Sequence, residues 1–344
     1  MIKYITFGRL YFFKSTVLMV KIKSLFIIGF LMVTATQYAQ YTDIINSNRP
    51  GESMSAFSVG KTVIQAEGGL YGIREKHDLS RYEANGFGTE LDVRYGAFFD
   101  QFEFILNTQY QYDWYTAPLV EDTRGGFKQV TLGAKYLVYD PFVQMKDAKP
   151  NVYSWKANHK FSWKQFIPAV AVYGGFNLNI GTNPFTFPSD PTISPKLMVI
   201  TQNHFGSKWV WVNNFIADKY MTDYPTLGWI STMTRGFNMR WSGFLEIQGY
   251  KSDWYGDSVF RLGAAYLVRE NIQLDASFAK NVKDTPSILY GSFGASWRFD
   301  SNYETNYRRI KNEKKDDKKK KDKKSKRDKG KKRKDEIELE NTKP

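Results

Sequence analysis

Apolar and polar residues alternate along much of this chain. In Val130-Thr-Leu-Gly-Ala-Lys-Tyr-Leu-Val138 every second residue, starting with Val130, is apolar or small, and Phe260-Arg-Leu-Gly-Ala-Ala-Tyr-Leu-Val268 repeats the pattern. A period of two places the apolar side chains on one face of a β-strand and the polar side chains on the other. The pattern therefore predicts strands with one face against an apolar environment.

Twelve segments carry this alternation. They span residues 61–73, 86–99, 101–114, 126–140, 166–180, 193–206, 208–221, 225–235, 237–251, 257–269, 271–281 and 287–299. Each is long enough for the ~9–11 residues with which a tilted strand crosses a bilayer, and an even number of strands is typical of outer-membrane barrels. The predicted fold is all-β: a transmembrane antiparallel β-barrel of about 12 strands over residues 61–299.

The connections between the segments alternate in length, as they do in outer-membrane barrels with short periplasmic turns and longer outer loops. Short turns are expected at Asp100, Gly206-Ser207, Gly236 and Glu270, and longer loops at residues 74–85, 115–125, 181–192, 220–224, 252–256 and 282–286. Residues 141–165 break this rule, because they form a long basic segment on the periplasmic side. That segment contains Trp155, Trp163, Lys146, Lys149, Lys156, Lys160 and Lys164 against Asp147.

Aromatic residues make up 17% of the chain, although its mean hydropathy is only −0.49. Tyr and Trp gather near segment ends, at residues 110–115, 209–211 and 254–255, where their amphipathic rings would mark the lipid–water interfaces. Beyond the N-terminus, no segment approaches the ~20 consecutive apolar residues of a transmembrane helix. An aromatic-rich soluble β-sandwich is the alternative interpretation.

Residues 1–39 have the layout of a secretory signal peptide, with a basic start, a short apolar run from Leu25 to Val33 and small residues before a cut near Ala39. Translation can start at Met1 or at Met19. The alternative is an N-terminal membrane anchor, although the apolar run is short for a bilayer span. Residues 40–60 are polar and precede the first strand, so we expect a periplasmic N-terminal segment or a plug in the barrel mouth.

The net charge of +14 lies at the two ends of the chain. Residues 308–344 contain 19 Lys and Arg against 9 Asp and Glu, and residues 1–40 add 5 Lys and Arg and no acid, which leaves residues 41–307 with a net charge of −1. Residues 300–344 are therefore predicted to be a disordered, Lys-rich tail, because such a composition buries almost no apolar surface. Since the tail follows an even-numbered strand, it should emerge in the periplasm.

The tail suggests partners with negative charge. Expected contacts are outer-membrane lipids, peptidoglycan, and periplasmic or outer-membrane proteins, whereas nucleic acid is not expected in that compartment. The candidate partner-binding residues are Lys318, Lys319, Lys320, Lys321, Lys323 and Lys324. Solvated charge without a partner is the alternative interpretation.

The face opposite each apolar stripe would line the barrel lumen. The charged candidates on that face are Glu67, Glu90, Asp92, Arg94, Glu103, Asp113, Lys135, Arg240, Glu246, Arg261, Arg269, Asp275 and Arg298. Acidic and basic side chains are nearly balanced. They would either pair across the interior as a structural network or line a water-filled path with little charge selectivity.

The last predicted strand ends in Ser292-Phe-Gly-Ala-Ser-Trp-Arg-Phe299. This sequence resembles the C-terminal β-signal of outer-membrane proteins, in which a polar residue, a glycine and two terminal aromatic residues are recognised by the barrel-assembly machinery. Ser292, Gly294, Trp297 and Phe299 match that pattern. The resemblance implies the barrel-assembly machinery as a partner, although here 45 residues follow Phe299. The same aromatic residues would also serve simply as part of the lipid-facing stripe.

Three motifs precede or open the first strand: Asn48-Arg-Pro-Gly-Glu-Ser53, Phe57-Ser-Val-Gly-Lys61 and Gln65-Ala-Glu-Gly-Gly69. They resemble the start of the outer-membrane β-barrel transporter family named for a role in the meta pathway of phenol degradation. In that family an Arg-Pro segment and a Val-Pro-Lys-Gly stretch lead into a Gln-x-Glu-x-Gly strand, and Val59-Gly60-Lys61 matches the second motif in part. With the strand pattern, the resemblance covers residues 46–299 and implies a barrel with a transport role.

The sequence offers no recognisable catalytic centre. It contains no cysteine, its three histidines are scattered, and it lacks the G-x-S-x-G, phosphate-loop and H-E-x-x-H motifs. We therefore expect no cofactor, no metal site and no enzymatic activity.

The sequence thus predicts a protein of the outer membrane of a Gram-negative bacterium that passes small solutes passively. The alternative function is that of a non-conducting accessory subunit of a larger outer-membrane complex, such as barrel-assembly or protein-secretion machinery, which docks through its basic periplasmic tail. The substrate and the identity of any partner do not follow from periodicity.

Overall fold

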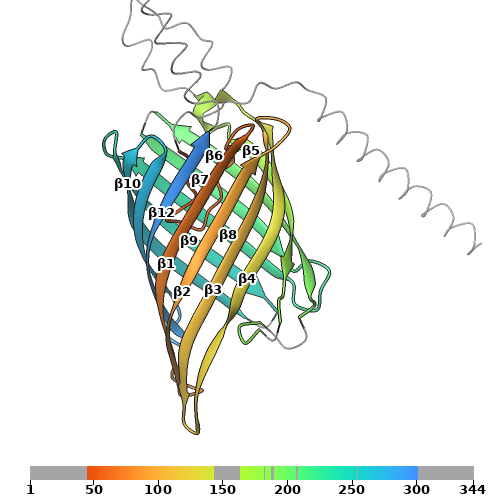
Figure 1. Ribbon diagram of the computed structural model, residues 1–344, viewed down its shortest axis with the longest axis vertical. Coiled ribbons are helices and arrows are strands. Elements are labelled where there is room, and N and C mark those ends of the chain that lie inside the picture. Colours follow the sequence, from red (N-terminus) through yellow and green to blue (C-terminus); the bar gives the residue numbers. More distant parts are fainter. Residues whose placement is uncertain are drawn as a thin grey trace, which may run out of the picture. The chain divides into compact units, whose positions relative to one another are not determined.

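The computed structural model describes residues 45–142 and 163–300, apart from residues 182, 187–189, 207 and 254 and the side chain of Lys164. Twelve antiparallel strands form one closed barrel, in which each strand pairs with its neighbours in the sequence and β12 lies beside β1 (Figure 1). The predicted all-β barrel is therefore confirmed.

The strands correspond one to one with the twelve predicted segments. Their bounds are β1 Val63–His77, β2 Tyr82–Gly96, β3 Phe102–Ala117, β4 Val120–Tyr139, β5 Ala169–Leu178, β6 Ile193–Phe205, β7 Trp209–Asp218, β8 Thr226–Gly236, β9 Trp241–Ser252, β10 Gly256–Arg269, β11 Ile272–Asn281 and β12 Ser287–Asp300. The turns that contain Asp100, Gly206, Gly236 and Glu270 are short, as predicted. A 3-10 helix, η1, spans Trp163–Phe166, so β5 begins three residues later than predicted.

Two of the predicted outer loops are instead mostly strand. The β1–β2 pairing continues to His77 and Tyr82, and the β3–β4 pairing continues to Ala117 and Val120, so residues 74–85 and 115–125 form tight hairpins. Figure 1 shows both hairpins projecting beyond the other connections at the same end of the barrel. The apolar alternation stops there because neither face of these hairpins needs to be apolar outside the lipid.

The outer surface of the barrel is apolar. Side chains such as Leu91, Leu245 and Phe260 are 46%, 67% and 54% exposed, and they alternate with inward-facing residues along their strands. Trp209 and Trp241 are exposed where β7 and β9 begin. A continuous apolar band with aromatic residues at its edge is the lipid-facing surface of an outer-membrane barrel.

Several predictions concern residues outside the described part of the chain. These are the signal peptide, the tail with its candidate partner-binding lysines, and Lys146, Asp147, Lys149, Trp155, Lys156 and Lys160 of the long connection. They remain predictions. Within the described residues, no helix has the length and apolar character needed to span a membrane.

Close backbone packing where β1 begins leads to a testable expectation. A Cβ atom on Gly96 would lie 1.6 Å from the carbonyl oxygen of Gly60, which has a φ of 95°. Gly96→Ala should therefore shift residues 57–61 and destabilise the barrel, with a decrease of about 1–3 kcal/mol in the free energy of unfolding, as overpacking does. Urea unfolding of the purified barrel, followed by tryptophan fluorescence, measures this. Gly72→Ala is the matched control, because a Cβ there meets nothing within 4 Å; an equal loss in both variants would contradict the explanation.

Candidate functional site

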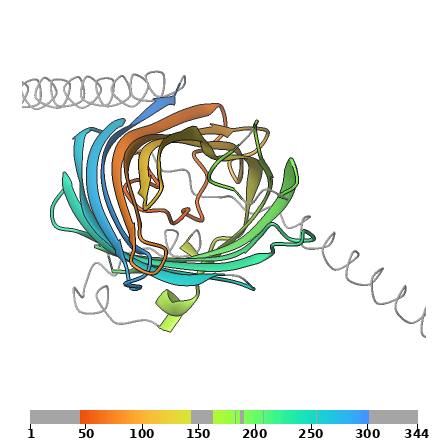
Figure 2. The same ribbon diagram turned by 90° about the horizontal axis from the view of Figure 1, so that it is seen from below.

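Residues 45–60, here called the luminal segment, lie inside the ring of strands (Figure 2). This segment forms no strand or helix, yet Arg49, Ser53, Ala56 and Val59 are all buried. Its backbone groups therefore need hydrogen-bond partners from the barrel wall, because an unpaired buried amide or carbonyl is costly. The wall provides those partners through charged and amide side chains on many strands.

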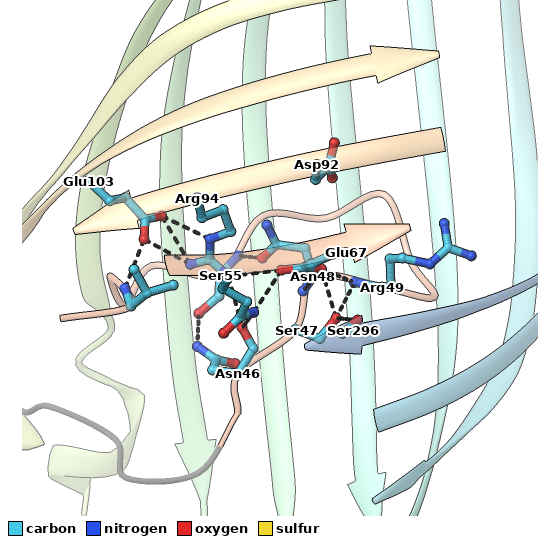
Figure 3. Close-up of polar contacts among 12 residues, drawn as sticks. Asn46, Ser47, Asn48, Arg49, Ser55, Glu67, Asp92, Arg94, Glu103 and Ser296 are labelled. Atoms are coloured by element: carbon cyan, nitrogen blue, oxygen red, sulfur yellow. Dashed lines mark hydrogen bonds and ion pairs between the residues drawn. The ribbon is translucent and has the colours of Figure 1, made fainter. Parts of the chain in front are cut away.

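Glu67 of β1 holds the start of the luminal segment (Figure 3). Its Oε2 atom accepts hydrogen bonds from Ser47 Oγ at 2.7 Å, from the Asn48 amide at 2.9 Å and from the Arg49 amide at 3.1 Å. Its Oε1 atom accepts from Arg94 Nη1 at 3.3 Å. One fully buried carboxylate thus fixes a turn of the segment to the wall.

A buried ionic cluster of Arg94, Glu103 and Lys135 also anchors the luminal segment. Arg94 Nη2 lies 2.9 Å from Glu103 Oε1, and Lys135 Nζ lies 2.7 Å from the same oxygen. Both cations also donate to the luminal segment: Arg94 Nη1 to the Asn46 carbonyl at 2.8 Å and Lys135 Nζ to the Ser55 carbonyl at 2.6 Å. The cluster therefore ties strands β1 to β4 to the segment.

Arg49 extends from the luminal segment to the junction of β1 and β12, where the barrel closes. Its guanidinium pairs with Glu90 of β2 and, at 3.2 Å, with Asp275 of β11. A Cβ atom on Gly69 or Gly294 would lie 2.3 or 2.5 Å from that guanidinium, so both glycines make room for it. Burial opposes the charge of Arg49, but the two carboxylates more than offset this effect and raise its pKa above the ordinary value.

Strands β6, β7 and β9, across the lumen from β1 to β4, bind the second half of the luminal segment. Glu246 of β9 accepts from the amides of Glu52 and Ser53 at 3.1 and 3.3 Å, and Asn214 of β7 accepts from the Met54 amide at 2.6 Å. Gln202 of β6 accepts from the Ala56 amide at 3.0 Å. Glu246 also lies 3.6 Å from Arg261, whose Nη2 donates to Glu52. The segment is therefore held on both sides of the lumen.

Most of the predicted lumen residues face the barrel interior. Those that are buried or half-buried are Glu67, Glu90, Asp92, Arg94, Glu103, Asp113, Lys135, Glu246, Arg261, Asp275 and Arg298. Asp113 pairs with Arg124 at 2.8 Å near the β3–β4 hairpin, and Arg298 donates to the Val59 carbonyl at 3.3 Å. The structure thus joins most of these residues to the luminal segment or to one another.

Two predicted lumen residues lie elsewhere. Arg240 is exposed in the turn before β9, where its Nη1 donates to Tyr266 Oη at 3.3 Å, and Arg269 is exposed at the end of β10. The alternation was extended too far in both cases. A bulge between Leu267 and Arg269 also changes which face the last residue of β10 occupies.

The four residues of the resembled β-signal lie on two faces of β12. Trp297 and Phe299 are exposed on the lipid face with ring centroids 5.9 Å apart, whereas Gly294 faces the lumen beside Arg49. Ser292 pairs with Ser277 through hydroxyls 2.7 Å apart. Recognition of this strand by the assembly machinery stays a prediction.

Sequence reasoning missed several residues that hold the luminal segment. Arg49 precedes the first strand, and Gln65, Gln202 and Asn214 are uncharged, so none was on the list of charged strand residues. The sequence did contain a signal for Gln65, Gln202 and Asn214, because each occupies an inward position of its strand. A polar amide at such a position indicates a hydrogen-bond partner inside the barrel.

The luminal segment separates two cavities. The inner cavity, of about 350 Å³, lies near the strand ends from which β7 and β9 begin and is lined by residues such as Phe57, His204, Val212 and Phe244. The outer cavity, of about 180 Å³, lies on the other side and is lined by residues such as Asp92, Asn107, Lys196 and Tyr250. Asn48 and Gly51 line both cavities. The segment thus lies between the two cavities.

The described residues contain no group of three or more His, Asp or Glu side chains arranged to hold a metal ion.

The chain is similar in fold to several solved structures. One is an outer membrane channel from Pseudomonas putida F1, at 12% identity and a TM-score of 0.45, where the match covers 73% of this chain and 99% of that chain. Another is the KdgM porin, at 10% identity and a TM-score of 0.39, with 67% and 99% covered. A third is the CymD monoaromatic hydrocarbon channel, at 8% identity and a TM-score of 0.38, with 70% and 89% covered.

No curated protein matches the sequence. A protein-family comparison, in contrast, matches residues 47–299, which include the luminal segment from Ser47 onward and nearly the whole barrel. This range covers well over half of the chain and agrees with the family resemblance of the Arg-Pro and Gln-x-Glu-x-Gly motifs. The chain belongs to the family described as "Putative MetA-pathway of phenol degradation".

Proposed function

We propose that this protein is a passive channel for small solutes, in which the luminal segment sets the size limit. The observation that carries the proposal is the pair of cavities on either side of that segment. A barrel that served only as a scaffold would gain stability from a filled interior, whereas a conducting barrel needs open space along its axis.

The wall chemistry supports passage without tight binding. Most luminal charges are paired, as in Arg94–Glu103 and Arg261–Glu52, so a neutral solute meets hydroxyl, amide and apolar groups rather than a strong field. We further propose that the N-terminal segment and the tail face the periplasm, because both precede or follow the strand ends at which the short turns lie.

Liposome swelling tests the channel function. Purified protein in vesicles should admit glycerol and small sugars faster than protein-free vesicles do, with a sharp decline as solute size increases, because the cavities are small. Ion current across a planar bilayer provides a second readout. No swelling for the smallest solutes together with no ion current would refute a conducting barrel.

A further inference from the structure

Asp92, which lines the outer cavity, differs from the other luminal carboxylates. Glu67, Glu103 and Asp275 each lie within ion-pair distance of an Arg or Lys. Asp92 accepts a hydrogen bond from Asn107 Nδ2 and makes no ion pair with any described residue. Figure 3 shows it standing apart from the network that joins Glu67, Arg94 and Glu103.

The surroundings of Asp92 add no positive charge. Its register partner on β1 is Glu67, and its partner on β3 is Asn107. The Oδ1 atom of Asn107 is itself buried and has no hydrogen-bond partner. Asn107 Oδ1 thus lacks a donor, and Asp92 lacks a cation among the described residues. An ionised carboxylate without a counter-ion is costly inside a membrane barrel, and a cationic ligand would supply that counter-ion.

The opposite wall of the outer cavity does not compensate for this charge. Lys196 of β6 lines the cavity, but it lies beside Asp218 of β7 in the strand register, and Asp218 lines the cavity as well. Glu52, the third carboxylate of the lining, is paired with Arg261 at 2.8 Å. The lining thus holds three carboxylates against one lysine, and of the three only Glu52 makes an ion pair with a described residue. In their ionised form these carboxylates attract cations and repel anions.

The rest of the lining is suited to an apolar body. Tyr173 and Tyr250 present aromatic rings, and Met198, Ile216 and Ile230 add thioether and aliphatic surface. Aromatic faces attract cations, and methionine adapts to ligands of irregular shape. The cavity volume of about 180 Å³ restricts the ligand to a small molecule.

We infer that the outer cavity is a binding site for small organic ammonium ions, with Asp92 as their counter-ion and Asn107 Oδ1 as a second acceptor. The ammonium group would donate to these two atoms while its hydrocarbon part contacts the tyrosine and methionine side chains. This inference deepens the proposed channel function, on which it rests, by naming a class of solute that the channel favours.

Titration calorimetry of the detergent-solubilised barrel tests the site. Phenethylammonium chloride, 2-phenylethanol and sodium phenylacetate are the probes, because they share a ring and differ in charge. The ammonium ion should bind roughly tenfold or more tightly than the alcohol, and the carboxylate most weakly, as expected for one uncompensated charge in a partly buried site.

Asp92→Asn is the decisive variant, since it keeps the shape and removes the charge. It should weaken ammonium binding roughly tenfold and leave alcohol binding unchanged. Asp122→Asn, on the projecting β3–β4 hairpin, removes the same charge far from the cavity and should leave both unchanged. Equal binding of ammonium ion and alcohol by the wild type, or undiminished ammonium binding by Asp92→Asn, would overturn the assignment.

A separate readout distinguishes this inference from the channel function. Swelling of vesicles in neutral sugars should be the same for the wild type and Asp92→Asn, because the cavity keeps its size. If neutral sugars do not pass through the wild type, the channel function fails, while the calorimetric comparison still decides the binding site.

Discussion

Removal of residues 45–56 should increase the single-channel conductance of the barrel on the order of tenfold, because it takes away the segment that narrows the lumen between the two cavities. The deletion leaves Phe57 to Lys61 in place, so Val59 still donates to Glu103 at 2.8 Å and accepts from Arg298. Planar-bilayer recording measures the change, and vesicle swelling should extend to larger sugars.

Deletion of residues 311–344 is the control, since it removes only residues that follow the last strand in the sequence. That variant should conduct like the wild type. Heat-modifiable migration on a detergent gel checks that the 45–56 deletion still folds. A folded variant with wild-type conductance would show that the luminal segment does not limit passage.

The barrel could be predicted from the sequence because lipid on one side and a polar lumen on the other impose a period of two on every strand. Val130 to Val138 and Phe260 to Val268 show that period plainly, and both lie within observed strands. The outer hairpins were missed because, beyond the lipid, strand pairing relies on backbone hydrogen bonds and polar pairs such as Arg74–Glu83. Such pairing leaves no apolar signature.

The luminal network was predictable only in part. Their charge and the alternation along the strands predicted that Glu67, Arg94 and Glu103 face inward. The alternation does not reveal which of these residues bind the luminal segment. That depends on the path of residues 45–60, which have no periodicity. The roles of Gly69 and Gly294 follow from where Arg49 lies in three dimensions, so no local pattern indicates them.

Arg94→Met should lower the free energy of unfolding of the barrel by about 3–5 kcal/mol, because it leaves Glu67 buried without a cation and removes one of the two cations from Glu103. Urea unfolding in detergent micelles, followed by tryptophan fluorescence, measures the loss. The matched control is Arg74→Met: Arg74 is 63% exposed and pairs with Glu83 on the projecting hairpin, where solvent screens the interaction, so no measurable change is expected. If the two substitutions proved equally mild, the cluster of Arg94, Glu103 and Lys135 would contribute little to folding, and its main effect would be to position the luminal segment.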